Sequence, residues 1–526
     1  MPNEATTAVV VPVLIFLFSL VSRALVTRSS EATFDVHGHL YFAQVLSEQR
    51  SGPFGEITLR VVGASGFSQP FMWHWLLGFF NQRFISAHQA SINGLIDSAF
   101  ALISYLLLLH AGYNERVAVF AVALYLLTPM WFSSLAIGPR IAGFTPRLSS
   151  EIATNLFFVV TLLPIGLPTP AVQILAISLA TFVLSSSKFG VQALLFLTPL
   201  ISVLAQRWQP MLALMLGFGF TLIVSQGRIL RQLNAQLSHL AWYFRENLAG
   251  RMHVSNRNSF RALVKRAELS AREYAARFLY RVLSENSYTS VIVKLPLLLV
   301  IIPACVVSLQ QGTNEALTAA PILAAVILYF LVNLRPLLFL GEAERYLNHV
   351  AFFITQFAAQ HALEQGSEWT LWLLLAYGFV YWLLESFVLT KLKPARLSER
   401  QARDALVLQD LRQLPETTVV LCYPYHAGSG VYQIMSTTRH QTLFCFGTSA
   451  DFSSRFDSKY AADYPYIKLE KLDEMADEYG IGYLVLDRRD LQTRGFGRWK
   501  PSKQWIARAA GGDTYDIYSR PVNGLG

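Results

Sequence analysis

An acid and two histidines occupy alternate positions early in the chain, in the stretch from Ala32 to Glu56. They are Asp35, His37 and His39, and they follow an apolar run that is long enough to cross a bilayer. Carboxylate and imidazole groups transfer protons and bind metal ions. Ionisable groups beside a membrane span are costly to desolvate, so this cluster indicates a site. A solvated loop with a polar start is the alternative interpretation.

A divalent metal ion is one candidate ligand of this stretch. His37 and His39, with Asp35 or Glu151, supply the donor types that such an ion prefers. Two histidines at this spacing are also an ordinary pair in an extended segment, so both interpretations stay open. The three cysteines of the chain are too few for a disulfide framework or a multi-cysteine metal site.

The elements that must position these residues are membrane spans. Apolar residues make up 53% of the chain and charged residues 15%, and the mean hydropathy is +0.38, which excludes an ordinary soluble enzyme. The first apolar run has no small-residue cleavage pattern, so we expect it to stay as a span. The sequence predicts a polytopic α-helical membrane protein with about eleven spans, the tenth the weakest, at 8–26, 91–109, 116–135, 148–166, 170–186, 189–206, 210–225, 291–309, 318–338, 349–363 and 369–391.

Two long loops and a C-terminal domain complete the predicted organisation. Residues 28–90 form a first loop with a short interfacial or re-entrant helix at 69–80. A basic loop at 226–290 has eleven Lys or Arg against four Asp or Glu, and we interpret its helices as amphipathic and lying on the membrane surface. Residues 1–391 form the membrane domain, and 392–526 form a soluble α/β domain.

The soluble domain is predicted from strands that alternate with helical patterns. We expect a mainly parallel sheet with strands at Val419–Tyr423, Thr442–Phe446 and Tyr483–Asp487, and helices at Ser398–Leu414 and Leu472–Tyr479. On our span count, this domain and the polar loops lie on one face of the membrane. The net charge of +9 suits anionic lipid or lipid phosphate, and the chain has no nucleic-acid-binding motif.

The layout resembles that of the integral-membrane GT-C glycosyltransferases. It is most similar to the bacterial relatives of protein O-mannosyltransferases and aminoarabinose transferases. Common features are an acid just beyond the first span, an interfacial Pro-aromatic helix and an Arg-Tyr pair late in the membrane region. The segments that carry the resemblance are Phe34–Leu46, Ser68–Phe79, Phe144–Ile152, Ser187–Leu200 and Gly341–His349.

The resemblance implies a reaction and a catalytic acid. Members of the family move a sugar from a polyprenyl-phosphate carrier to an acceptor, here a lipid-linked glycan or a protein. Asp35 matches the position of their catalytic acid, so we interpret it as the general base of an inverting transfer. Many members have two adjacent acids there, whereas Val36 follows Asp35 in this chain. Either Asp35 acts alone or a more distant carboxylate, such as Glu56, supplies the second function.

A departing phosphate requires positive charge, and three residues are candidates. Arg147, Lys188 and Arg345 lie at the functional ends of different predicted spans. A guanidinium can hold two phosphate oxygens, and an ammonium acts as a point charge. Cations at span ends are also common as plain snorkelling anchors. Because all three lie on the predicted face of Asp35, we favour donor-phosphate binding, with Tyr346 beside Arg345 and with Glu342 and Glu344 as groups that orient it.

The side of the membrane follows from the resemblance. It implies a bacterial inner membrane with the active site on the periplasmic face. Counting Lys and Arg gives the opposite orientation, but that rule is weak for loops as long as the basic loop. We therefore expect the functional face to be external.

Two other functions remain open. In a transporter or flippase of lipid-linked glycans, Asp97, Lys294 and Arg335 would line a path. The sequence has no internal repeat of the kind that transporters often show. An O-antigen polymerase or ligase would share the substrates and would depend on arginine and histidine in an external loop.

Overall fold

The chain divides into two compact units. The membrane unit comprises Met1–Ala32, Gln69–Trp73 and Arg83–Lys393, and the sheet unit comprises Thr33–Ser68, His74–Gln82 and Pro394–Gly526. The computed structural model describes residues 4–27, 34–62, 66–133, 135, 141, 143–248, 256–264, 271–313, 315–388, 405–414, 416–424, 431–443, 455–456, 458–462, 466–508 and 515–520.

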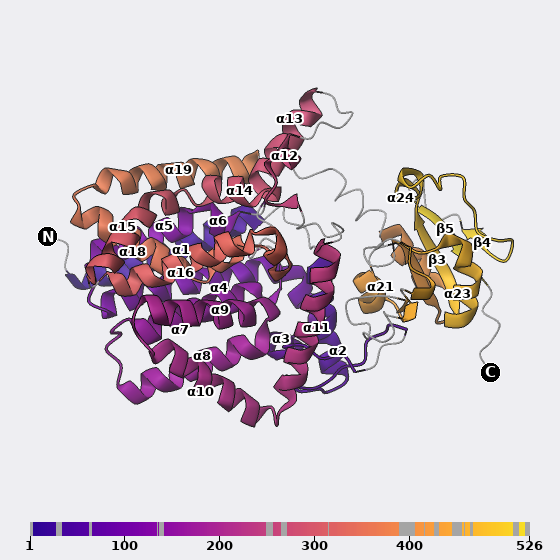
Figure 1. Cartoon of the computed structure of the whole chain (residues 1–526), viewed down its shortest axis with the longest axis horizontal. Coiled ribbons are helices and arrows are strands. Elements are labelled where there is room, and N and C mark those ends of the chain that lie inside the picture. Colours follow the sequence, from indigo (N-terminus) through magenta and orange to yellow (C-terminus); the bar gives the residue numbers. More distant parts are fainter. Residues whose placement is uncertain are drawn as a thin grey trace. The chain divides into compact units, whose positions relative to one another are not determined.

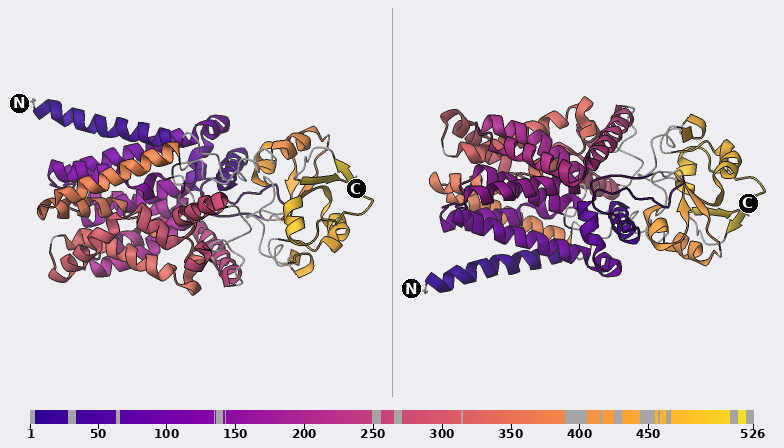
Figure 2. Two further views of the ribbon diagram at one scale, coloured as in Figure 1. Left: turned by 90° about the horizontal axis from the view of Figure 1, so that it is seen from above. Right: turned by 90° about the horizontal axis from the view of Figure 1, so that it is seen from below.

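The membrane unit is a bundle of helices that run side by side (Figures 1 and 2). Its helices are α1 (Glu4–Thr27), α4 (Gln82–His110), α5 (Glu115–Leu127), α6 (Pro129–Phe132), α7 (Pro146–Leu162), α8 (Thr169–Ser186), α9 (Lys188–Leu204), α10 (Gln209–Val224), α11 (Arg228–Leu248), α12 (Phe260–Leu263), α13 (Ala271–Tyr280), the π-helical turn η2 (Arg281–Glu285), α14 (Ser287–Lys294), α15 (Leu297–Gln311), α16 (Ala316–Val332), the 3₁₀ helix η3 (Arg335–Leu340), α17 (Glu344–Asn348), α18 (Ala351–Glu364) and α19 (Glu368–Phe387). The residues of the short helix α3 (Met72–Gly78) are divided between the two units, with Met72 and Trp73 in the membrane unit and His74 to Gly78 in the sheet unit.

Local sequence signals set where several of these helices begin. Thr145 caps α7 by accepting from the Arg147 N–H, and a proline occupies the first turn. Ser187 caps α9 by accepting from the Gly190 N–H. Such caps satisfy backbone donors that have no partner inside the helix. The N-termini of α7 and α9, which carry Arg147 and Lys188, are therefore fixed by their own sequence.

Small residues let the helices approach closely. A Cβ on Gly217 of α10 would lie 2.6 Å from the Ala180 Cβ of α8, and one on Gly378 of α19 would lie 2.1 Å from the Leu127 carbonyl oxygen. Close approach at small residues is how helices gain packing energy where lipid offers no hydrophobic gain.

The prediction of about eleven spans is not confirmed. Four helices are long and apolar enough to cross a membrane, and two bent pairs raise the number to six, among the described residues. Several predicted spans are shorter helices: α5 has 13 residues, α15 has 15 and α18 has 14. At 1.5 Å per residue, these helices are shorter than a hydrocarbon core of about 30 Å.

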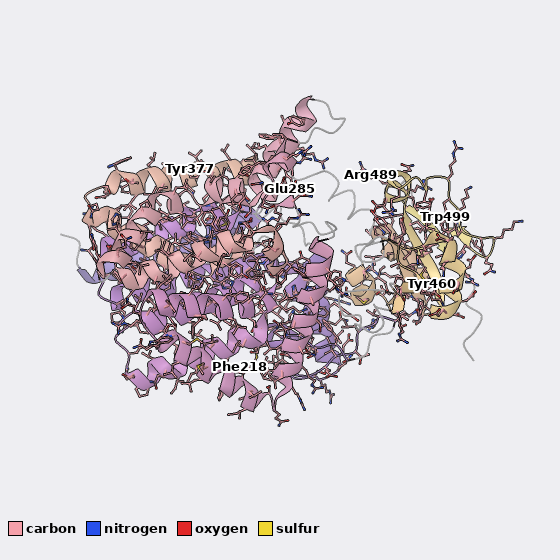
Figure 3. The ribbon with its side chains drawn as sticks, viewed as in Figure 1. Phe218, Glu285, Tyr377, Tyr460, Arg489 and Trp499 are labelled. Atoms are coloured by element: carbon pink, nitrogen blue, oxygen red, sulfur yellow. The ribbon has the colours of Figure 1, made fainter. Side chains whose placement is uncertain are left out.

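The sheet unit combines the first loop with the C-terminal segment. It holds α2 (Phe34–Glu48), α21 (Val431–Thr437), the 3₁₀ turn η5 (Leu469–Lys471), α23 (Leu472–Tyr479), α24 (Arg488–Thr493) and five strands, β1 (Val419–Tyr423), β2 (Gln441–Thr442), β3 (Ile481–Asp487), β4 (Ile506–Arg508) and β5 (Tyr515–Ser519). The strand order is β2-β1-β3-β5-β4. Buried side chains that include Leu421, Leu484 and Tyr460 form its core. Figure 3 labels Tyr460 in this unit.

The sheet is mixed, not mainly parallel as predicted. β1 pairs in parallel with β2 and β3, whereas β5 runs antiparallel to both β3 and β4. The predicted strands at β1 and β3 and the predicted helix Leu472–Tyr479 lie where the sequence places them. β2 ends at Thr442, and residues 444–450 lie outside the described part of the chain, as do residues 398–404 of the predicted helix Ser398–Leu414.

Candidate functional site

A glycine turn places α17 against the N-terminus of α9. Gly341 follows η3 with a φ of +99°, a conformation that side chains with a Cβ rarely adopt. A Cβ at this position would also lie 3.1 Å from Phe189 Cε2. Both the turn and the close approach therefore require glycine at this position. The turn brings Arg345 over Phe189, the residue that follows Lys188.

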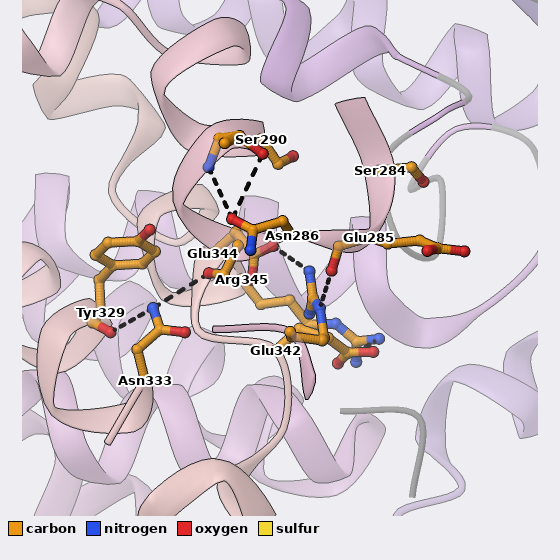
Figure 4. Close-up of polar contacts among 12 residues, drawn as sticks. Ser284, Glu285, Asn286, Ser290, Tyr329, Asn333, Glu342, Glu344 and Arg345 are labelled. Atoms are coloured by element: carbon orange, nitrogen blue, oxygen red, sulfur yellow. Dashed lines mark hydrogen bonds and ion pairs between the residues drawn. The ribbon is translucent and has the colours of Figure 1, made fainter. Parts of the chain in front are cut away.

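Arg345 has a local carboxylate partner and remaining hydrogen-bonding capacity. Its Nη2 lies 2.7 Å from Glu342 Oε2, three residues earlier, and its side chain is 18% exposed. Its Cζ lies 5.0 Å from the centre of the Phe189 ring, a cation–π distance. Its Nε is buried and has no hydrogen-bond partner among the described residues. Figure 4 shows Arg345 beside Glu342.

Glu344 is held by an arginine that the sequence analysis did not select. Arg257, from the basic loop, is 5% exposed and forms an ion pair with Glu344. Its Nε also donates to the Glu285 carbonyl at 3.4 Å. The Glu344 carboxylate therefore pairs with Arg257. The prediction that Glu344 orients Arg345 through an ion pair between the two is wrong. No local spacing connects residues 87 positions apart.

Phe189 connects Lys188 to the Arg-Tyr pair. Its ring lies 5.2 Å from the Tyr346 ring and stacks on His349 at 6.1 Å. Tyr346 is fully buried, and its Oη has no hydrogen-bond partner among the described residues. Lys188, half-buried, is the first residue of α9. The structure thus brings the α9 N-terminus and α17 together.

α7 joins the same cluster through its first two turns. Ser150 lies so close to Gly190 of α9 that a Cβ there would be 2.8 Å from the Ser150 Cβ. Asn348 of α17 donates its Nδ2 to Glu151 Oε1 at 3.3 Å. Arg147 is half-buried in the first turn of α7. We name this meeting point of α7, α9 and α17 the cationic cluster, since it carries Arg147, Lys188 and Arg345.

Two solved structures match nearly the whole chain. ArnT from Cupriavidus metallidurans in the apo state is 12% identical, with a TM-score of 0.53 over 98% of this chain and 98% of that chain. The oligosaccharyltransferase from Archaeoglobus fulgidus in complex with zinc and sulfate is 14% identical, with a TM-score of 0.50 over 97% of this chain and 73% of that chain. The chain has a GT-C fold. No protein-family model and no curated protein sequence matches it.

The match confirms the resemblance that the sequence predicts, at the level of the fold. Because one fold can host several chemistries, function has to be argued from the site residues. Within this GT-C fold, the predicted donor-site residues of the membrane unit lie on contacting elements. Asp35, His37, His39 and Glu56 belong to the sheet unit.

Asp35 is the second residue of α2, and its side chain lies outside the described part of the structure. The helix begins at Phe34, so His37 and His39 lie in a helix and not in an extended segment. In a helix, residues two apart point in different directions. His37 accordingly lies 2.9 Å from Gln433 Nε2, and His39 Nδ1 lies 2.7 Å from His74 Nε2.

The two histidines therefore do not converge on one metal ion. Among the described residues there is no group of three or more His, Cys, Asp or Glu that could hold a metal. A role for Asp35 in metal binding stays a prediction. Burial lowers the pKa of His37 below its ordinary value of 6.5, so its ring is neutral at neutral pH. Glu56 is exposed on the first loop.

Asp97, an intramembrane acid, is paired between helices. Its Oδ2 lies 2.7 Å from Arg23 Nε, and its Oδ1 accepts from Tyr125 Oη at 2.5 Å. Asp97 and Arg23 are both fully buried. Arg23 has no local sequence signal, because its partner lies 74 positions away.

Lys294 and Arg335 occupy two further places in the membrane unit. Lys294 is fully buried at the end of α14, where the chain bends by 88° into α15. Arg335 opens η3 and is exposed.

Proposed function

We propose that the chain is a glycosyltransferase that moves a sugar from a polyprenyl-phosphate-linked donor to a lipid-linked glycan or a protein. The observation that carries this proposal is the cationic cluster, above all Arg345, whose buried Nε has no hydrogen-bond partner among the residues that the structure describes. A partly buried guanidinium that retains donor capacity suits an anionic ligand that supplies acceptor oxygens. The GT-C fold, which the chain shares with two sugar-transferring enzymes, supports the same reaction class.

The donor phosphate would replace part of the local pairing of Arg345. Its fork can bind two phosphate oxygens, while Lys188 and Arg147 add positive charge from α9 and α7. As the bond between the sugar and the phosphate breaks, negative charge builds on the phosphate, and fixed cations stabilise that charge. Tyr346, whose buried hydroxyl has no hydrogen-bond partner in the described part of the chain, would add one hydrogen bond.

Asp35 would act as the general base. Its carboxylate takes the proton of the acceptor nucleophile as that nucleophile attacks the anomeric carbon. Attack opposite to the leaving phosphate inverts the configuration of that carbon. The proton ends on Asp35, the sugar on the acceptor, and the electron pair of the broken bond on the polyprenyl phosphate.

The contacts of Asp97 do not favour the transporter alternative. Both of its carboxylate oxygens have partners in neighbouring helices, namely Arg23 and Tyr125. Such pairing is typical of a residue that holds helices together. Asp97 is therefore a poor candidate for the lining of a transport path.

Asp35→Asn tests the proposed base with almost no change in volume. Transfer should fall by about a thousandfold, while binding of undecaprenyl phosphate and thermal stability stay unchanged. The assay measures release of undecaprenyl phosphate from a panel of undecaprenyl-phosphate sugars mixed with native membrane acceptors. Glu56→Gln in the same assay shows whether Glu56 supplies a second function, because activity close to wild type in this variant would mean that Asp35 acts without it. Activity of Asp35→Asn within a few-fold of wild type would move the base to Glu56 or Glu151.

The same assay in sealed vesicles tests the side of the membrane. We propose that the site faces the periplasm of a bacterial inner membrane. Right-side-out vesicles should then glycosylate an acceptor peptide or glycan that is added outside, without detergent. Transfer that appears only after permeabilisation would place the site on the cytoplasmic side.

A further inference from the structure

The first loop is built into the C-terminal sheet. Val61 bridges Thr442 in parallel, the Thr442 N–H donates to the Arg60 carbonyl at 3.0 Å, and the Val62 N–H donates to the Thr442 carbonyl at 3.0 Å. Thr442 belongs to β2, which is the edge strand of the sheet on this side. An exposed strand edge readily accepts a further strand. The first loop thus supplies a short additional strand to a sheet that lies far along the sequence.

Arg60 adds a side-chain connection between the same segments. Its Nη1 donates to the carbonyls of Met435 at 3.3 Å and Thr438 at 2.8 Å. These carbonyls lie at the C-terminal end of α21, where helix carbonyls lack partners and carry partial negative charge. The Arg60 N–H donates to Tyr41 Oη at 2.8 Å, and Tyr41 is a buried residue of α2. Arg60 therefore links α2 to the end of α21.

α2 and α21 also pack directly on each other. A Cβ on Gly38 would lie 2.9 Å from Tyr432 Cε2, so α2 needs glycine at the point where the tyrosine ring meets its backbone. The rings of Phe42 and Tyr432 meet edge to face at 5.9 Å. Tyr432 is 3% exposed, so its ring has little room to move away.

Gln433 completes the contact beside the proposed base. Its Nε2 donates to His37 Nε2 at 2.9 Å. An amide nitrogen can only donate, so His37 must accept with an unprotonated Nε2. Burial lowers the pKa of His37, which keeps that nitrogen available. His37 is two residues beyond Asp35 on the same helix.

We propose that Tyr432 and Gln433 are positioning residues, through which the C-terminal segment holds α2, and with it the backbone of Asp35, in place for transfer. This inference rests on the proposed function, in which Asp35 is the base. It gives the C-terminal segment a role in catalysis without contact with the substrate. The role follows from the packing at Gly38, the hydrogen bond to His37 and the added strand at Val61.

Gly38→Ala in the full-length protein tests the proposal, because the new methyl group meets the Tyr432 ring. A displacement of about 1 Å near the chemistry costs about a hundredfold in rate. We expect kcat to fall by about that factor, with an unchanged KM for the undecaprenyl-phosphate sugar. Amide hydrogen exchange across residues 34–48 should become faster. The matched control is Gly52→Ala in the same loop, where an added Cβ has nothing within 4 Å.

A second substitution separates positioning from a general loss of folding. Tyr432→Leu combined with Gly38→Ala removes the ring that the methyl group meets, so the double variant should recover kcat and slow exchange in α2. Gln433→Ala should lower kcat with an unchanged melting temperature, and Gln433→Asn should rescue part of the loss. Wild-type kcat in Gly38→Ala, or a double variant no better than the single one, would overturn the inference.

The two levels of the proposal fail in different ways. If Asp35→Asn is inactive but Gly38→Ala is fully active, the positioning role is wrong and the base assignment stands. If Asp35→Asn is active, the base assignment is wrong. Changes in hydrogen exchange at α2 would then still report whether α21 holds this helix.

Discussion

Two arginines of the membrane unit, Arg23 and Arg345, differ in where their partners come from. Arg23 on α1 pairs with Asp97 of α4, donates its Nη1 to the Leu126 carbonyl at 2.9 Å and lies over the Phe132 ring at 5.7 Å. These partners lie on other segments of the bundle. Arg345 pairs with Glu342, three residues away.

The difference separates a charge that holds the fold from a charge that can bind a ligand. Removing Arg23 would leave a carboxylate buried between helices, because Asp97 is fully inside the bundle. Arg345 is 18% exposed, and its carboxylate partner belongs to the same short segment. A ligand can therefore replace that partner without moving one helix relative to another. A fully buried pair between helices indicates structure, and a partly exposed arginine with a partner on its own segment indicates binding.

Breaking the ion pair between Arg23 and Asp97 should have the largest effect on the stability of the protein. Arg23→Ala or Asp97→Ala leaves one buried charge without its partner, which costs about 3–5 kcal/mol. We expect little folded protein, or a large drop in melting temperature, when the variants are purified in detergent. Size-exclusion chromatography with a thermal melt measures this.

The double variant Arg23→Met/Asp97→Leu sharpens the comparison. It removes both charges and keeps apolar volume, so most of the lost stability should return. Transfer activity should return with it, because the pair has no proposed part in the chemistry. A stable but inactive double variant would mean that Arg23 or Asp97 acts in the reaction, and the distinction between the two arginines would fail.

Arg345 should show the opposite pattern. Arg345→Ala removes charged hydrogen bonds to the donor phosphate worth about 1.5–3 kcal/mol, so binding of undecaprenyl phosphate should weaken strongly. Arg345→Lys keeps the charge but loses the two-pronged hydrogen bonding of the guanidinium. Its affinity for undecaprenyl phosphate should lie between those of wild type and Arg345→Ala. Titration of undecaprenyl phosphate into purified protein gives the affinity, and a melt of the same samples gives the stability.

A structural Arg345 would behave differently in those two measurements. Both variants would lose melting temperature, while the folded fraction would bind undecaprenyl phosphate as wild type does. Arg147 and Lys188 would then be the remaining candidate phosphate ligands. Arg116→Ala is a matched control, because this arginine is exposed and its ion pair with Glu368 joins α5 to α19, neither of which belongs to the cationic cluster.

The same distinction explains what the sequence could predict. The cationic residues of α7, α9 and α17 lie at ends of apolar runs, a local pattern, and the structure brings their elements together. The strand Val419–Tyr423 is likewise predictable from the sequence, because it is a short run of apolar residues. Arg23 with Asp97 and Arg257 with Glu344 are joined across long sequence separations, so no spacing predicts them.

The first loop shows a second limit of sequence patterns. Its segment at 60–62 pairs with β2, some 380 residues later, through backbone hydrogen bonds that most side chains permit. Gly38 carries the one local hint, since glycine inside a helix is unfavourable unless packing requires it. The close approach of Tyr432 supplies that requirement.

Phe189 offers the smallest and most selective test of how Arg345 is held. The Arg345 guanidinium lies 5.0 Å from the ring centre, and a partly exposed cation–π contact is worth about 0.5–1 kcal/mol. Phe189→Leu keeps apolar bulk but loses the negative ring face, so affinity for undecaprenyl phosphate should fall about two- to fivefold. Phe189→Tyr keeps the ring and should bind as wild type does. If leucine and tyrosine weaken binding equally, the ring acts through its shape against Gly341 and Tyr346, and the cation–π contact does not position Arg345.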